Sequence, residues 1–263
     1  MSPPAMTLVG VTGMPMIQPG DDLVALITGS LAAQSTPLED GDVVVITSKI
    51  VSKSEGRFVD LRTVTASERA CRLAARTEKD PRLVEVVLRE STGVSRARPG
   101  ILIVRHRLGF TSSVAGIDHS NVGGGDDLVL LLPEDPDASA VRLRAGLEAA
   151  SGRRLAVVVT DTHGRPFRRG NIGVAIGVAG LPAIIDLRGE SDLFGRMLVA
   201  TEVPLADMVA AAAGLIAGET VERLPVVVLR GLPQRGDGRG ADLVRSPAQD
   251  LYGALEEEAN LPR

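Results

Sequence analysis

Short apolar runs along the chain mark the expected strands. Each is rich in Val, Ile, Leu or Ala and is bounded by polar or turn residues, the pattern of a buried strand. The runs are Val43–Ile46, Ile101–Val104, Leu128–Leu132, Leu155–Val159, Ile172–Val178, Ala183–Leu187 and Val226–Leu229.

Segments with helical spacing lie between some of these runs: Asp21–Leu31, Ser67–Arg76, Pro81–Glu90, Asp137–Ala150, Leu205–Ala217 and Asp250–Glu258. Ser67 is a typical helix cap, and Pro81 suits a first helical position. The acidic residues and prolines of Leu132–Ala140 favour a helix start over a ligand site. Because helices and strands do not alternate strictly, the order indicates an α+β fold with mixed sheets.

Composition limits the class of protein. With 263 residues, 44% of them hydrophobic, the chain can bury a sizeable core. We expect a single domain over residues 1–263, with a seam near Gly123–Gly125. A net charge of -4 without a basic stripe argues against nucleic acid. No apolar run approaches the ~20 residues of a membrane span, and no leader pattern is present, so we expect a cytoplasmic protein.

Two residue types add detail. The single cysteine, Cys71, excludes a disulfide within the chain and is expected to be a buried, inert thiol. Aromatic residues make up only 2% of the chain, which argues against a stacking platform for bases or flavins.

The strongest candidate for chemistry is Thr160–Gly170, after the expected strand Leu155–Val159. A carboxylate at a strand end, Asp161, beside the Thr162 hydroxyl suits a hard cation. Arginines such as Arg165 can neutralise phosphates. The alternative is a turn that Asp161 caps, with solvated arginines.

Three weaker candidates accompany it. Asp118 in Ala115–Val122 is either a second metal carboxylate or an Asx-turn residue. Lys49 and Lys53 are two of only three lysines, and their compact charge suits phosphate, although a solvated strand end explains them equally well. The Gly-Pro turn at Gly13–Met16 either faces a nucleotide or is a plain turn. The histidines lack zinc spacing, and neither a P-loop nor a Rossmann motif is present.

Together these segments resemble the coenzyme F420-0:γ-glutamyl ligase family, including the N-terminal half of its longer actinobacterial version. The matching stretches follow the family's order: Gly13–Leu23, Asp40–Arg57, Ala115–Val122, Leu132–Ala140, Thr160–Gly170 and Ala175–Gly180. The resemblance implies a family-specific α+β fold that forms an intertwined homodimer. It also implies the stand-alone form, without a flavin-binding nitroreductase-like domain.

The same resemblance implies the activity: GTP-dependent addition of L-glutamate to F420-0 through an acyl phosphate, with further γ-linked glutamates as an extension. It implies two Mg²⁺ or Mn²⁺ ions, with K⁺ as a further candidate. Asp118 and Asp161 look like ligands of the first metal, and Thr162 and Glu219 of the second. The residues similar to nucleotide contacts are Gly13, Met14, Pro15, Met16, Ser48, Lys49, Lys53, Asn121, and Ala217, Gly218 and Glu219 in the loop Ala217–Leu224.

The expected catalytic set consists of Asp118, Asp161, Lys53 and Arg165. The positive side chains of Lys53 and Arg165 would screen the repulsion between the substrate carboxylate and the polyphosphate. Val114 and Met208 depart from the family, which often has Asn and usually Glu there. Two other functions stay open: a metal-dependent phosphatase or phosphotransferase, and a non-catalytic nucleotide-binding homologue.

Overall fold

The computed structural model describes residues 4–119, 122–123, 125–233 and 236–249. The expected helix Asp250–Glu258 lies outside these ranges. The chain groups into two compact units, the first formed by Met1–Glu55, Pro133–Thr162 and Ile172–Leu243, and the second by Gly56–Leu132, His163–Asn171 and Val244–Arg263. No unit boundary falls at residues 123–125, and the expectation of a single domain stays a prediction.

A five-stranded mixed sheet forms the centre of the first unit. Its strands, in spatial order, are β1 (Thr7–Gly10), β12 (Val226–Arg230), β2 (Val43–Thr47), β8 (Ala156–Arg165) and β9 (Arg168–Ala179). β12 runs antiparallel to β1 and β2, whereas β2 runs parallel to β8, with Val44 opposite Val157. The mixture of parallel and antiparallel pairs, with helices around it, confirms the predicted α+β class.

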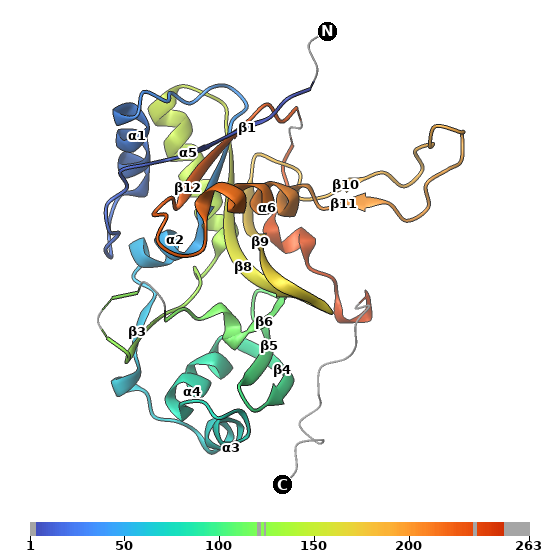
Figure 1. The fold of residues 1–263 in the computed structure, drawn as a ribbon. Coiled ribbons are helices and arrows are strands. Elements are labelled where there is room, and N and C mark those ends of the chain that lie inside the picture. Colours follow the sequence, from blue (N-terminus) through green and yellow to red (C-terminus); the bar gives the residue numbers. More distant parts are fainter. Residues whose placement is uncertain (1–3, 120–121, 124, 234–235, 250–263) are drawn as a thin grey trace. The chain divides into compact units, whose positions relative to one another are not determined.

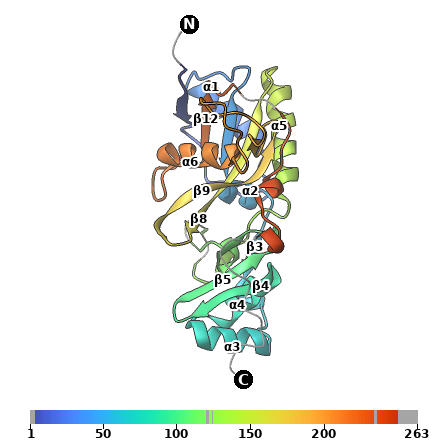
Figure 2. The same cartoon turned by 90° about the vertical axis from the view of Figure 1, so that its right-hand side faces the viewer.

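Helices cover both faces of this sheet. α6 (Leu205–Ala217) lies on one face and α5 (Pro136–Ser151) on the other, where it contacts α1 (Leu23–Ala33) (Figure 2). Leu205, Val209 and Ala213 on the buried side of α6 pack in one apolar cluster with alternate residues of β2, β8 and β12. The strands are therefore apolar on both sides, which explains their continuous Val and Ile runs.

A short pair of strands, β10 (Ile185–Asp186) and β11 (Glu202–Val203), begins an arm that leaves the first unit beside α6 (Figure 1). The arm carries Leu193 and Phe194, which are 99% and 95% exposed. The sequence predicts a longer strand, Ala183–Leu187, but only two of its residues pair.

Two carboxylates tie distant parts of the first unit together. Asp42 is 0% exposed and accepts hydrogen bonds of 2.8 Å from both Nε and an Nη of Arg230. This pairing is the main cause of the raised pKa of Arg230. Asp137, in the first turn of α5, accepts from the backbone N–H groups of Val178 and Gly240 at 2.9 and 2.6 Å.

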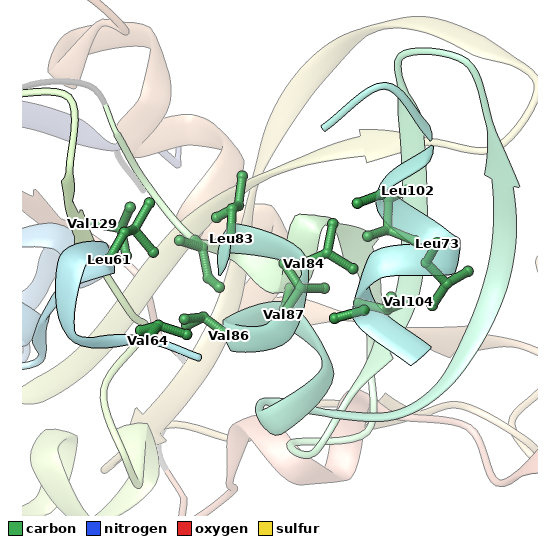
Figure 3. Packing of buried hydrophobic residues seen from close by; sticks show 14 of the residues in the cluster. Leu61, Val64, Leu73, Leu83, Val84, Val86, Val87, Leu102, Val104 and Val129 are labelled. Atoms are coloured by element: carbon green, nitrogen blue, oxygen red, sulfur yellow. The ribbon is translucent and has the colours of Figure 1, made fainter. Parts of the chain in front are cut away.

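The second unit has its own core. It contains α3 (Glu68–Thr77) and α4 (Pro81–Arg89), the antiparallel sheet β4 (Ser91–Arg98), β5 (Ile101–His106) and β6 (Thr111–Ser113), and the pair β3 (Phe58–Asp60) and β7 (Leu128–Leu130). Side chains of α4 such as Val84 and Val87 face Leu73 of α3 and Val104 of β5 within one apolar cluster (Figure 3). Burial of such side chains contributes roughly 1.5–3 kcal/mol each.

Several local predictions are confirmed. Ser67 caps α3 through its hydroxyl, Asp135 caps α5 through its carboxylate, and Pro81 opens α4. The expectation of a buried Cys71 is wrong, because this thiol is exposed. The buried face of α3 consists of Ala70, Leu73, Ala74 and Thr77, and Cys71 lies off that face. Within the described residues, no helix is both long and apolar enough to traverse a membrane.

Candidate active site

The junction between β2 and α2 (Ser48–Ser54) places the first site residue. Thr47 ends β2 opposite Thr160 of the parallel strand β8, and α2 begins at the next residue. This register brings Ser48 beside the residue after Thr160. The Ser48 hydroxyl donates a 3.0 Å hydrogen bond to Oδ1 of Asp161 across a separation of 113 residues. Nothing in the spacing of the sequence signals this contact.

α2 itself was not predicted, since its sequence is short and polar. It carries both lysines of the candidate set, and the Lys53 side chain is only 5% exposed while Lys49 is half-buried. Burial of a charged lysine is costly unless its surroundings compensate the charge. The helix therefore holds Lys53 in a defined place, and the interpretation of a solvated strand end is wrong for this residue.

A second pair lies at the C-terminal end of α6. Thr162 of β8 donates a 3.2 Å hydrogen bond from its hydroxyl to Oε1 of Glu219. Glu219 follows Gly218, which caps α6 with a φ of 69°. With a ψ of -175° this conformation is one that glycine alone adopts readily, and a Cβ there would also displace the carboxyl group of Glu222, 2.2 Å away.

The loop after Gly218 is braced by Glu222. Its carboxylate accepts from the backbone N–H of Thr220 at 2.8 Å, and this hydrogen bond is the largest cause of the lowered pKa of Glu222. Glu222 therefore stays ionised at neutral pH and fixes the chain just after Glu219.

The first unit thus contains two separate hydrogen-bonded pairs, Ser48 with Asp161 and Thr162 with Glu219. Asp161 and Thr162 are neighbours in β8, so their side chains leave the strand on opposite faces. Asp161 is half-buried, whereas Thr162 and Glu219 are exposed. All four offer oxygen atoms, the donors that Mg²⁺ and Mn²⁺ prefer. In the described part of the chain no three His, Cys, Asp or Glu side chains form a metal-binding group. A hard cation bound by either pair would therefore take hydroxyls, water or phosphate as its other ligands.

The strand β8 differs from expectation at this point. The sequence places its end at Val159, but β8 continues to Arg165, and only Pro166 and Phe167 form the turn into β9. Pairing with β9 keeps the polar half of the strand extended. Asp161 and Thr162 therefore lie within a strand and not after it, and the interpretation of Asp161 as a turn cap is wrong.

The end of this hairpin, His163–Asn171, belongs to the second unit. The Arg165 guanidinium donates a 2.6 Å hydrogen bond to the backbone carbonyl of Arg169, which holds it across the hairpin. The His163 ring lies 4.8 Å from the Phe110 ring, and Phe110 stacks on the buried His106 at 5.1 Å.

Asp118 also belongs to the second unit. It follows the turn Val114–Gly116, in which all three residues have positive φ, and its backbone pairs with Leu130 in an isolated bridge. A left-handed valine is strained, and strain of this kind concentrates at functional sites. A shared cation between Asp118 and Asp161 stays a prediction. Asn121 lies outside the described residues.

The segment Gly13–Met16 precedes α1. Its glycine has a φ of 75° with open space around it, and the Met14 sulfur accepts a 3.4 Å hydrogen bond from the Ser30 hydroxyl of α1. Met16 is largely exposed. Its part in nucleotide binding stays a prediction.

Asp207 and Met208 are neighbours on α6 with different surroundings, and Met208 is the position that departs from the family. Asp207 accepts a 2.9 Å hydrogen bond from the backbone N–H of Ala175 in β9, so it fastens α6 to the sheet. Met208 is 56% exposed on the outer side of α6. No contact of Met208 explains why methionine stands there.

Carboxylate and hydroxyl oxygens are the donors that a divalent cation takes in enzymes that act on phosphate. Comparison with known proteins makes the class specific. Residues 12–231 match the family described as F420-0:Gamma-glutamyl ligase, and the chain belongs to this family.

Three curated relatives, all called coenzyme F420:L-glutamate ligase, resemble nearly the whole chain. The protein of Methanothermobacter thermautotrophicus is 45% identical over 250 residues, covering 94% of this chain and 98% of its own. The protein of Halorubrum lacusprofundi is 47% identical over 90% of this chain and 91% of its own. The protein of Archaeoglobus fulgidus is 43% identical over 92% and 94%.

Proposed function

We propose that this protein joins L-glutamate to coenzyme F420-0, as the names of its family and relatives suggest, and that GTP drives the reaction, as the sequence resemblance implies. The family match over residues 12–231 carries the proposal. The pairing of Ser48 with Asp161 and of Thr162 with Glu219 supports it, because each pair joins oxygen donors from two distant segments of the chain.

Formation of an amide from a carboxylate is unfavourable in water, so the carboxylate of F420-0 must first be activated. In the first step a carboxylate oxygen of F420-0 attacks the γ-phosphorus of GTP, and the bond to the β-phosphate oxygen breaks to release GDP. In the second step the amine of glutamate attacks the acyl carbon, phosphate leaves, and the amine proton passes to solvent or base. Addition of further γ-linked glutamates repeats the two steps on the new carboxylate.

Residues of α2 and β8 would position the phosphates. Ser48 and Lys49 reach from the first turn of α2, and the buried Lys53 adds a fixed positive charge. Arg165 offers a second cation. These charges lower the repulsion between an anionic carboxylate and a polyphosphate, and the gain comes from positioning and electrostatics.

Divalent cations fit the oxygen donors of the first unit. Asp161, Thr162 and Glu219 would hold them, and Mg²⁺ or Mn²⁺ when bound would neutralise charge on the phosphate oxygens. That Asp118 is a further ligand, that two ions bind, and that K⁺ takes part are expectations from the resemblance. A cytoplasmic location has the same standing.

A homodimer is the expected assembly, and two exposed apolar features of the first unit support it. The arm carries Leu193, Phe194, Met197 and Val199, all largely exposed. Met208 and Leu215 are also exposed, seven residues apart on one side of α6. Solvent-exposed apolar patches of this kind mark association surfaces, and a second copy of the chain is the partner we propose for both.

Mass spectrometry of F420-0 incubated with the protein, GTP, Mn²⁺ and glutamate tests the function. Gains of one or more glutamyl units are expected, together with sustained GDP formation that requires glutamate. Sustained GDP release that does not depend on glutamate would indicate a phosphatase or phosphotransferase. Tight GTP binding without turnover would indicate a non-catalytic homologue.

A further inference from the structure

The turn between β8 and β9 contains an aromatic residue in an unfavourable conformation. Phe167 has a φ of 58° and a side chain that is 92% exposed. It follows Pro166, whose ring fixes its own φ. A proline followed by a left-handed residue is the pattern of a type II turn, where glycine or asparagine is usual. A phenylalanine in this backbone conformation is strained. Because the ring is almost fully exposed, burial of apolar surface offsets little of that strain.

The hairpin end that carries Phe167 is attached to an aromatic stack of the second unit through His163. The chain has only four Phe, one Tyr and no Trp. His163, at the base of the same hairpin end, contacts Phe110, which in turn stacks on the fully buried His106 with an interplanar angle of 9°. The hairpin end is thereby anchored to a rigid aromatic stack. The expectation that the chain lacks a stacking platform for bases or flavins stays a prediction, and a ligand stacked on Phe167 would contradict it.

Basic residues flank Phe167 in the sequence of the hairpin end. The hairpin end His163–Asn171 contains Arg165, Arg168 and Arg169 and no acidic residue. Arg165 is held across the hairpin by its hydrogen bond to the Arg169 carbonyl. An exposed ring among cations favours a ligand that combines a planar π-system with an anionic group.

We propose that this hairpin end binds the ring of the coenzyme, with Phe167 stacking on the planar deazaflavin of F420-0 and the arginines facing its anionic tail. The proposal rests on the proposed function. A guanine base has the same general chemistry, and Arg165 of the hairpin end is itself expected to face the polyphosphate, so contact of Phe167 with the nucleotide is one outcome of the test.

Substitutions at Phe167 separate ring contact from fold. Phe167→Gly and Phe167→Asn both suit a left-handed turn residue, so the melting temperature should stay equal or rise. Fluorescence titration of F420-0 onto either variant, without GTP, should show a Kd raised roughly tenfold, the loss expected for one stacked ring. KM for F420-0 should rise with it, whereas KM for GTP should not change. Phe167→Tyr, which keeps the ring, should bind within about threefold of the wild type.

Each other outcome has a defined meaning. Unchanged F420-0 affinity in both ring-less variants overturns the proposal, even if the wild type is an active ligase. A raised KM for GTP alone assigns the ring to the nucleotide and also overturns it. If the variants lose the dimer in sedimentation but keep their affinity for F420-0, the hairpin end contacts a second copy of the chain, and this outcome also overturns the proposal. If the wild-type protein binds F420-0 through Phe167 but adds no glutamate, the proposed function is contradicted and this inference still holds.

Discussion

Ser48 and Asp161 share a 3.0 Å hydrogen bond although 113 residues separate them in the chain. The contact follows from one piece of topology, the parallel register of β2 and β8, which sets Thr47 opposite Thr160. Because the hydroxyl donates to one carboxylate oxygen, it fixes how Asp161 presents the other. The pair therefore links the expected nucleotide helix α2 to the expected metal strand β8.

Loss of the Ser48 hydroxyl should weaken catalysis. A hydrogen bond to a charged group contributes about 1.5–3 kcal/mol, so Ser48→Ala should lower kcat/KM by roughly 10- to 100-fold. Steady-state rates of glutamate-dependent GDP formation measure this loss.

Ser52 supplies the matched control one helical turn later. Its side chain is equally buried, and its hydroxyl has no hydrogen-bond partner among the described residues. Ser52→Ala should therefore leave both the rate and the melting temperature close to wild type. A rate loss of the same size in both variants would show that α2 only needs intact packing.

The left-handed turn before Asp118 should be relieved by asparagine. Val114 has a φ of 44°, which a β-branched residue tolerates poorly and asparagine tolerates well. Val114→Asn should raise the free energy of unfolding by about 1 kcal/mol and the melting temperature by roughly 2–4 °C. Calorimetry measures the shift, and Val114→Ala, which keeps a Cβ, should gain less. A lower melting temperature for the asparagine variant would contradict the assigned strain.

Much of the fold could be predicted from local pattern, and the departures have physical causes. Val43–Ile46 and Val226–Leu229 are buried on both faces, so their apolar runs are unambiguous. The polar half of β8, Thr160–Arg165, carries no apolar signal and is a strand because β9 pairs with it. α2 is too short and polar to show a helical period.

The candidate site was less accessible to pattern. Thr162 and Glu219 are 57 residues apart, and no spacing rule joins them. Only the resemblance to a family suggested both as ligands, and their hydrogen bond was not predicted. Phe167 is exposed because it lies in the two-residue turn between β8 and β9. The sequence analysis ended the first strand at Val159, so it did not predict this turn.

The pair Asp42–Arg230 should be a main support of the first unit. Removal of one partner of a buried pair costs about 3–5 kcal/mol, and since the Arg230 side chain is 34% exposed we expect about 2–4 kcal/mol for Arg230→Ala. Chemical denaturation measures the change. Arg142→Ala is the control, because Arg142 is 62% exposed in its pair with Glu55 and should cost less than about 1 kcal/mol. Equal losses for the two variants would contradict the special role of Asp42.

The arm should hold the dimer together. Phe194→Asp places a charge on its most apolar stretch, and sedimentation should then show a monomer where the wild type is a dimer. Val141→Asp is the comparison, since Val141 is 57% exposed on α5, on the other face of the sheet from α6, and should not change the assembly. A wild-type monomer at micromolar concentration would refute the proposed partner.

Glutamate-dependent GDP formation by Asp161→Asn, run beside mass spectrometry of the F420 product, tests the central claim most directly. The amide can still accept from Ser48, so circular dichroism and melting should match wild type, while loss of the negative charge should reduce ligation by roughly a thousandfold. Product formation at the wild-type rate in that variant would show that Asp161 does not hold the cation on which the chemistry depends.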